Sequence, residues 1–475
     1  MREGTMHVHG AAEKLPTWKL VIFALGQLGW SLASYGVSNL VTYFYMSPEG
    51  EGAQRVFPPF IFEGVLLGIF TVIGIINFGA RFFDAVTNPL IASWSDRSRS
   101  RMGRRKYFMA VSFAPFALFS VLVFFPLKHY TVISSPGASW LNTAWLSLTI
   151  LAFYFFYVMY TAPYNALISE LGHNPKERLF ISTAIGVTWS LGFAVGSQVY
   201  RLKAAFEGAF ALSPTGSFQA SQALFAAVSL VLMALPVLVI DEKRYVDSTV
   251  SDEPMMKSLR SALRNSNFVR FLGSELLYNV CQTIIQTGLV YYVVTLLLLK
   301  EEVTSDLLIL LFALSFVFYV PITALTVRWE KKRMTVIGFA LLALLFLMFC
   351  FMGLVPMSGL LYASITVAVA AIPIAIFTIV PNAIVADIAE AHGIETGDFK
   401  AGMFFGVRSF EINLGISVAN IVFPSLLLLG KTVEHPFGIR MSAVVAVLFC
   451  IGGLVIILLY DEKAVLRSLA KKEKF

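Results

Sequence analysis

A pair of charges inside a long apolar stretch is the feature that most restricts how this chain can fold. Residues 64–94 are long and apolar enough to cross a bilayer as a helix, yet they contain Arg81 and Asp84. Each charge at the centre of such a helix costs roughly 2.5–3.5 kcal/mol on insertion scales. With Asn88 they follow i, i+3, i+7 spacing and share one helix face. The pattern favours a face that lines a solute pathway or pairs across a helix bundle; a purely structural ion pair is the alternative.

The composition supports a membrane setting. Hydrophobic residues make up 57% of the 475 residues and charged residues only 14%, against about 25% in globular proteins. The net charge of +7 does not indicate a nucleic-acid partner, because the basic residues stand in short segments between apolar blocks. The three cysteines have neither disulfide nor metal-ligand spacing, so we expect no structural metal. Residues 1–16 are polar and the first apolar block is too long for a signal peptide, so we expect no cleaved leader.

The apolar blocks predict an all-α membrane protein with twelve transmembrane helices. The blocks are too long for strands and do not alternate in polarity. We place the spans at residues 18–46, 63–94, 107–127, 141–169, 182–200, 219–240, 268–299, 305–327, 334–355, 358–388, 402–430 and 438–460.

Basic residues predict the orientation of these spans. They are concentrated in the segments after the second, sixth and eighth spans and in the C-terminal tail. The positive-inside rule then places both termini in the cytoplasm of a multi-pass protein of the inner membrane.

A hydrophilic stretch divides the chain into two similar halves. We predict an N-terminal six-helix bundle at residues 1–240, a cytoplasmic linker at 241–267, and a C-terminal bundle at 268–475 with a short basic tail. Pro163 precedes the sequence NALISE at the end of the fourth span, and Pro381 precedes NAIVAD at the end of the tenth. Such parallels are typical of transporters with a site at the midplane between two repeats.

Four motifs resemble transporter signatures, one that of a superfamily and three, in the right order along the chain, those of one family within it. Residues 96–105 read DRSRSRMGRR and are similar to the loop signature D-R-x(n)-G-R-R of the major facilitator superfamily. Residues 81–89 read RFFDAVTNP and resemble R-x-x-D-A-x-x-D-P of the glycoside–pentoside–hexuronide:cation symporters, the branch of melibiose permease. Residues 163–178 and 386–403 resemble that family's motifs after helices four and ten.

The resemblance implies the major facilitator fold, with two pseudo-symmetric six-helix bundles, and cation-driven uptake by alternating access. It implies a small polar solute such as a sugar or glycoside, with sodium or a proton as coupling ion and no other cofactor. We expect a monomer surrounded by membrane lipids, without a nucleic-acid partner.

The chain departs from the family pattern at the proposed cation site. Neutral residues replace family carboxylates at Asn88, Thr161 and Ser31, and the common lysine of helix eleven is displaced or lost where residues 408–413 read RSFEIN. Sodium favours several oxygen ligands, which Asp84 with Asn88 and Thr161 could supply. Alternatively, Asp84 alone could carry a proton.

Polar stripes on two further spans predict the solute site. In the seventh span the stripe contains Glu275, Asn279, Gln282 and Gln286, and in the first span it contains Gln27 and Ser31, with Tyr35 beside it. Amides and hydroxyls suit a polyhydroxylated solute, although interhelical hydrogen bonding is the alternative. The remaining candidates for solute contact are Arg81, Tyr164, Asn165, Trp189, Arg408, Glu411 and Asn413. Of these, Arg408 and Glu411 could instead neutralise each other, and the two aromatic rings could simply pack.

Charged residues of the motif loops form a third predicted group. We expect them to hold the cytoplasmic helix ends together by charge pairs, with topology determination as the alternative role. They are Asp96, Arg97, Gly103, Arg104, Arg105, Glu170 and Asp387.

The chain lacks enzyme signatures. The nucleotide-binding pattern G-x-x-x-x-G-K-[ST] is absent, and no catalytic triad is evident. Two function classes therefore remain: a secondary transporter of a sugar or similar solute, and a carrier of a lysophospholipid or other amphiphile with the same fold. A non-transporting sensor is a weaker third reading. The 42 phenylalanines and the missing carboxylates keep the lipid alternative open.

Overall fold

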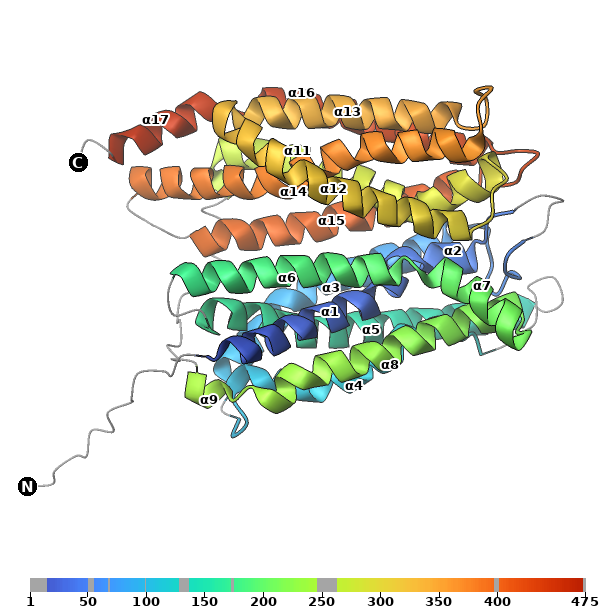
Figure 1. Ribbon diagram of the computed structural model, residues 1–475, viewed down its shortest axis with the longest axis horizontal. Helices are drawn as coiled ribbons and strands as arrows, with labels where there is room; N and C mark the ends of the chain where they lie inside the picture. The colour runs from blue at the N-terminus through green and yellow to red at the C-terminus, as the bar shows by residue number, and fades with distance from the viewer. Residues whose placement is uncertain are drawn as a thin grey trace, which may run out of the picture.

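The computed structural model describes residues 15–49, 55–66, 69–98, 100–127, 136–171, 175–245, 263–396 and 401–472. Long helices dominate these residues (Figure 1). The long helices are α1 (Thr17–Asn39), α3 (Val72–Arg97), α4 (Arg104–Leu122), α5 (Pro136–Leu171), α6 (Pro175–Gly196), α8 (Pro214–Val239), α11 (Ser266–Tyr291), α12 (Glu302–Arg328), α13 (Lys331–Phe351), α14 (Gly359–Thr396), α15 (Ala401–Leu427) and α16 (Phe437–Leu458).

These twelve helices correspond in order to the twelve predicted spans. Within the described residues, nine of them are long and apolar enough to cross a membrane. The other three are α3, α6 and α11. Two of these, α3 and α11, contain the buried charges Asp84 and Glu275.

The predicted second span, residues 63–94, begins too early. Two short strands instead pair antiparallel there, β1 (Val65–Leu66) with β2 (Phe70–Thr71). Helix α3 begins at Val72 because the hydroxyl of Thr71 accepts the Gly74 N–H at 3.0 Å and caps the helix. Asp84 therefore lies at the middle of the 26 residues of α3.

Short helices extend several spans. α2 (Val41–Tyr45) continues α1, α7 (Val199–Phe210) continues α6, and a π-helical turn (Tyr292–Leu296) continues α11. One further short helix follows the last span of each half: α9 (Glu242–Tyr245) in the first half and α17 (Glu462–Lys472) in the second. The predicted basic tail contains α17, which packs against α14.

The helices form two bundles that lie side by side (Figure 1). Helices α1 and α3–α8 pack among themselves, as do α11–α16, and α3 with α15 makes the most extensive contact between the two sets. We call the two ends of the bundles the α17 end, on the left of Figure 1, and the α7 end, on the right. The linker boundaries stay a prediction, because residues 246–262 lie outside the described ones.

Candidate solute and cation site

The charges of α3 form a buried pair. The Nη1 atom of Arg81 lies 3.6 Å from Oδ2 of Asp84, and the two residues are 7% and 1% exposed. Arg81 Nη2 also donates to Ser38 Oγ at 2.8 Å, and its guanidinium lies 4.8 Å from the centre of the Tyr154 ring. The second oxygen of Asp84, Oδ1, has no hydrogen-bond partner among the described residues. The predicted pair therefore exists and includes one unsatisfied acceptor.

The other two predicted cation ligands are not joined to Asp84 in this conformation. Thr161 is buried on α5 and Asn88 is half-buried on α3. No hydrogen bond between described residues links either side chain to the Asp84 carboxylate. The three-oxygen site therefore stays a prediction.

The polar stripe of α11 is accessible along an otherwise buried helix. From Tyr278 to Leu296 every residue is buried except Asn279, Gln282 and Gln286. A buried amide in an apolar bundle needs hydrogen-bond partners from the protein. These three side chains remain partly accessible, so water or a solute can reach them. The accessible positions repeat every three or four residues, as expected for one helix face.

Two of the predicted charges on α15 are bound to α11. Glu275 binds Arg408 with both oxygens: Nε lies 2.8 and 2.9 Å from Oε1 and Oε2, and Nη2 lies 2.6 Å from Oε1. Arg408 Nη1 donates to Asn382 Oδ1 at 2.6 Å. The prediction that Arg408 and Glu411 neutralise each other is wrong for this conformation, because the guanidinium is directed at the facing helix. Glu411 instead accepts a long hydrogen bond of 3.4 Å from Asn279.

The predicted residues of α1 are buried in packing contacts. Gln27, Ser31 and Tyr35 are 2%, 0% and 5% exposed. Ser31 donates to Leu28 O at 3.1 Å, and a Cβ at Gly192 would lie 1.8 Å from its Oγ, so the hydroxyl lies directly against α6. In this conformation these three residues are buried in packing, the Ser31 hydrogen bond stays within α1, and Gln27 Oε1 has no partner among the described residues. Their role in solute binding stays a prediction.

The two predicted aromatic contacts differ. Tyr164 is fully buried, stacks on Phe23 at 4.3 Å and donates its hydroxyl to the Phe23 carbonyl, so it packs rather than presents a face. Trp189 is 37% exposed and stacks on Phe193. Asn165 is exposed and Asn413 half-buried, so both polar side chains keep accessible surface.

At the α17 end, three of the residues predicted for gating form charge pairs, each within its own bundle. Arg105 lies 3.0 Å from Asp96, and Lys331 pairs with Asp387. Arg97 is exposed at the end of α3, and Arg104 begins α4. The side chain of Glu170 lies outside the described ones.

Gly103 makes the tight turn before α4. Its φ is +111°, a region that side chains rarely adopt, and a Cβ there would lie 2.4 Å from Glu242 Oε2. Sequence reasoning missed Glu242, which accepts the N–H groups of Arg105 and Lys106 at 3.0 and 2.8 Å. The available signal was an Asp-Glu-Lys tripeptide that follows the last span of both halves, at 241–243 and 461–463.

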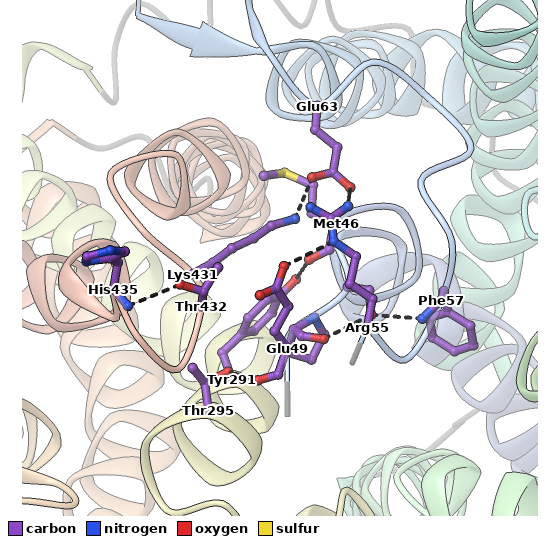
Figure 2. Close-up of polar contacts among 12 residues, drawn as sticks. Met46, Glu49, Arg55, Phe57, Glu63, Tyr291, Thr295, Lys431, Thr432 and His435 are labelled. Carbon is purple, nitrogen blue, oxygen red and sulfur yellow. Dashed lines mark hydrogen bonds and ion pairs between the residues drawn. The ribbon is translucent and has the colours of Figure 1, made fainter. Parts of the chain in front are cut away.

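A charged network joins the two bundles at the α7 end (Figure 2). Glu63 binds both Arg55, at 3.1 Å, and Lys431, at 2.6 Å. Arg55 also lies 3.1 Å from Glu49. Lys431 comes from the segment after α15, so this network bridges the halves. Burial lowers the pKa of Lys431, and the neighbouring Glu63 carboxylate opposes that shift.

Further contacts close the same end. Tyr291 donates its hydroxyl to Met46 O at 2.8 Å, and Thr295 donates to Glu49 O at 3.0 Å (Figure 2). Glu301 binds both Tyr43 and Lys203. Every ion pair between the bundles that joins described residues lies at this end, whereas the pairs at the α17 end lie within one bundle.

Comparison with known proteins agrees with this arrangement. A family model described as MFS/sugar transport protein matches residues 22–461. The chain is 23% identical over 263 residues to an isoprimeverose transporter of Lactiplantibacillus pentosus, covering 53% of this chain and 49% of that one. It is 30% identical over 122 residues to the uncharacterized symporter sll1374 of Synechocystis, covering 26% and 21%. The matches thus span about half or less of these curated relatives.

A solved structure shares the fold over nearly the whole chain. A mutant of the nucleoside transporter NupG superposes with a TM-score of 0.67 at 13% identity, covering 93% of this chain and 99% of that one. The arrangement is therefore the major facilitator fold of an integral multi-pass membrane protein. The chain belongs to the MFS/sugar transport protein family. The resemblance to the cation symporter branch is confirmed by the symporters and sugar carriers among its relatives.

Proposed function

We propose that the protein is a secondary active transporter that carries a sugar, a glycoside or a similar polar solute together with a cation by alternating access. The accessible amides of Asn279, Gln282 and Gln286 are the observation that supports this most directly. Amides donate and accept hydrogen bonds and therefore match a solute rich in hydroxyl groups. The family and the isoprimeverose transporter among its relatives agree with this solute class.

The contacts between the bundles support an inward-facing state. The α7 end is closed by Lys431–Glu63 and by Lys203–Glu301. If the positive-inside rule holds, the α17 end, with both termini, lies in the cytoplasm of an inner membrane. The solute would then leave toward the α17 end. We propose a monomer as the working unit, since the two bundles of a single chain contain both the candidate cation site and the candidate solute site.

Asp84 is our proposal for the main coupling site, with sodium or a proton as the ion. It lies at the middle of α3, is buried, and keeps one carboxylate oxygen without a partner among the described residues. A charge buried at this depth is energetically costly unless it is fully paired. Incompletely paired charges in membrane helices therefore usually mark functional sites. Arg81 provides only a 3.6 Å contact, so a cation could join the site after a small rearrangement.

Transport by the full chain in proteoliposomes tests the function. Isoprimeverose, a glucuronide and a lysophospholipid would each be offered under separately imposed sodium and proton gradients. We expect concentrative uptake of a sugar probe and none of the lysophospholipid. Gln282→Ala should weaken the apparent affinity for that probe about tenfold, the equivalent of one amide hydrogen bond. Thr323→Ala, which changes an exposed side chain on α12, is the control.

Two results would reject the proposal. Uptake of the lysophospholipid alone would assign the chain to the amphiphile carriers. Sugar uptake that no cation gradient accelerates would replace symport by facilitated diffusion.

A further inference from the structure

We propose that Glu411 on α15 is a second proton-binding site of the transport cycle, separate from Asp84. The proposal rests on the function proposed above and deepens it, because it assigns a proton to a carboxylate in the C-terminal bundle. Glu411 was expected from the sequence only as a solute contact or as the partner of Arg408. Its surroundings in the structure point to a different role.

Two buried carboxylates lie beside a single cation among the described residues. Glu275 and Glu411 are 4% and 6% exposed, and Arg408 is the one cation beside them in that part of the chain. The guanidinium is already committed, since Nε and Nη2 bind Glu275 and Nη1 binds Asn382. Two carboxylates thus share one cation, and the second carboxylate can be buried at low cost only as the neutral acid.

The Glu411 carboxylate has almost no hydrogen bonds or ion pairs, among the described residues, that would stabilise its negative charge. Its Oε1 accepts only the 3.4 Å bond from Asn279, and its Oε2 has no hydrogen-bond partner within the part of the chain that the structure describes. No Lys, Arg or His of that part forms an ion pair with it. Asp84 differs, because Arg81 lies 3.6 Å from it.

Among the described residues, the helices packed against α15 provide no cation that pairs with Glu411. Glu275 on α11 and Arg408 on α15 are the charged groups that act on Glu411, the first repelling its carboxylate and the second attracting it. The other titratable groups on the helices packed against α15 are Arg81, Asp84, Asp96 and Arg97 of α3, Arg270, Tyr278, Cys281 and Tyr291 of α11, Tyr362, Asp387, Glu390, His392 and Glu395 of α14, and Arg440 and Cys450 of α16. None of these groups forms an ion pair or hydrogen bond with Glu411 among the described residues.

The place of Glu411 in the fold suits a coupling role. Helices α3 and α15 cross in antiparallel directions, with Gly74 beside Ile421 and Thr71 bonded to Ser425. Asp84 lies ten residues from Gly74 and Glu411 ten residues from Ile421, so each stands about 15 Å from the crossing. The two carboxylates therefore lie at the same depth, one in each bundle.

Arg408 is the element that can switch. It lies three residues before Glu411 on the same helix, so its guanidinium can turn from Glu275 to Glu411 without leaving that helix face. When Arg408 binds Glu275, Glu411 holds its proton as the acid. When Arg408 turns to Glu411, the O–H bond breaks, the carboxylate pairs with the guanidinium, and the proton passes to water.

Infrared spectroscopy of the full chain in vesicles, titrated with acid and base and without solute, tests this directly. We expect the carbonyl band of a protonated carboxylic acid near neutral pH, absent in Glu411→Gln. Glu275→Gln should release Arg408 to pair with Glu411 and shift the band's titration to lower pH by at least one unit, a tenfold change in proton affinity. Asp84→Asn is the matched control and should retain the band.

The outcomes separate this site from the proposed function. An unchanged band in Glu411→Gln, or its loss in Asp84→Asn alone, overturns the assignment even if the protein transports a sugar. The Glu275→Gln shift provides the second test if Glu411→Gln does not fold. If no probe is transported under any gradient while the band behaves as expected, the symport proposal fails and the proton site remains.

Discussion

Glu242 and Glu462 occupy equivalent places in the two halves of the protein. Glu242 accepts the N–H groups of Arg105 and Lys106 at the start of α4, at 3.0 and 2.8 Å. Glu462 accepts those of Lys331 and Lys332 at the start of α13, at 2.8 and 2.9 Å. Each carboxylate thus comes from the segment after its half's last long helix. It caps that half's third helix, where a negative charge is favourable.

Removing either cap should destabilise its bundle by about 1 kcal/mol. Glu242→Ala and Glu462→Ala each leave two helix N–H groups without their carboxylate acceptor, so we expect a lower midpoint in thermal unfolding of the detergent-solubilised protein. Glu330→Ala is the matched control, because Glu330 also precedes α13 but makes no side-chain cap bond. Equal midpoints for Glu462→Ala and Glu330→Ala would contradict the capping role.

Gly103→Ala should slow the switch between conformations. A side chain at φ +111° and ψ +148°, a region occupied almost only by glycine, costs roughly 1–3 kcal/mol, and its Cβ would collide with the Glu242 carboxylate. Because the turn is remote from the α11 stripe, solute affinity should change little. Rates of solute exchange and equilibrium binding measure the two effects. Gly79→Ala, where a Cβ meets nothing within 4 Å, is the control. A weakened affinity with an unchanged exchange rate for Gly103→Ala would refute the assignment.

At the α7 end, Glu63→Gln should open the closed state more than Lys431→Met. The first variant leaves Lys431 buried without its partner, a loss of roughly 1–3 kcal/mol. The second leaves Glu63 paired with Arg55 at 3.1 Å and should cost less than about 1 kcal/mol. Spin labels at the exposed positions Phe210 and Leu429 report the opening as a longer distance. The reverse order of the two variants would show that Arg55 does not hold Glu63.

Alkaline pH should favour the closed α7 end. Burial holds the pKa of Lys431 below its ordinary value of 10.5, so the closed state binds fewer protons there than an open, solvated state. Closure therefore gains stability as pH rises through the interval between the lowered pKa and 10.5, by at most about 1.4 kcal/mol per pH unit. The same spin-label distances should shift toward the closed value, and Lys431→Met should remove this dependence.

Asp84→Asn should abolish uphill accumulation while downhill exchange of solute stays measurable. The amide cannot hold a proton and lacks the negative charge that attracts a cation, but it leaves the α11 stripe unchanged. Reconstituted vesicles under separate sodium and proton gradients provide the measurement. Unaltered concentrative uptake under both gradients would favour a static Arg81–Asp84 bridge.

The amino-acid sequence alone determined the helices, their number and the division into two similar halves. The reason is that a bilayer leaves few solutions for an apolar chain, so long apolar runs must become helices. Local chemistry also fixed the close pairing of Arg81 with Asp84, since three residues of helix bring them together. The main local error was the start of the second span, which was predicted at residue 63 but lies at Val72. Hydropathy measures only how apolar a segment is, so it does not detect the helix cap made by Thr71.

Tertiary structure alone decided which charges meet between helices. Spacing along α15 allowed Arg408 to pair with Glu411, but α11 passes so close that a Cβ at Gly415 would lie 2.8 Å from Asn279 Cβ. That approach places Glu275 against the guanidinium and leaves Glu411 without a cation. A sequence records which partners are possible on one helix face, whereas the crossing of two helices selects among them, because ion pairs form only over a few ångströms.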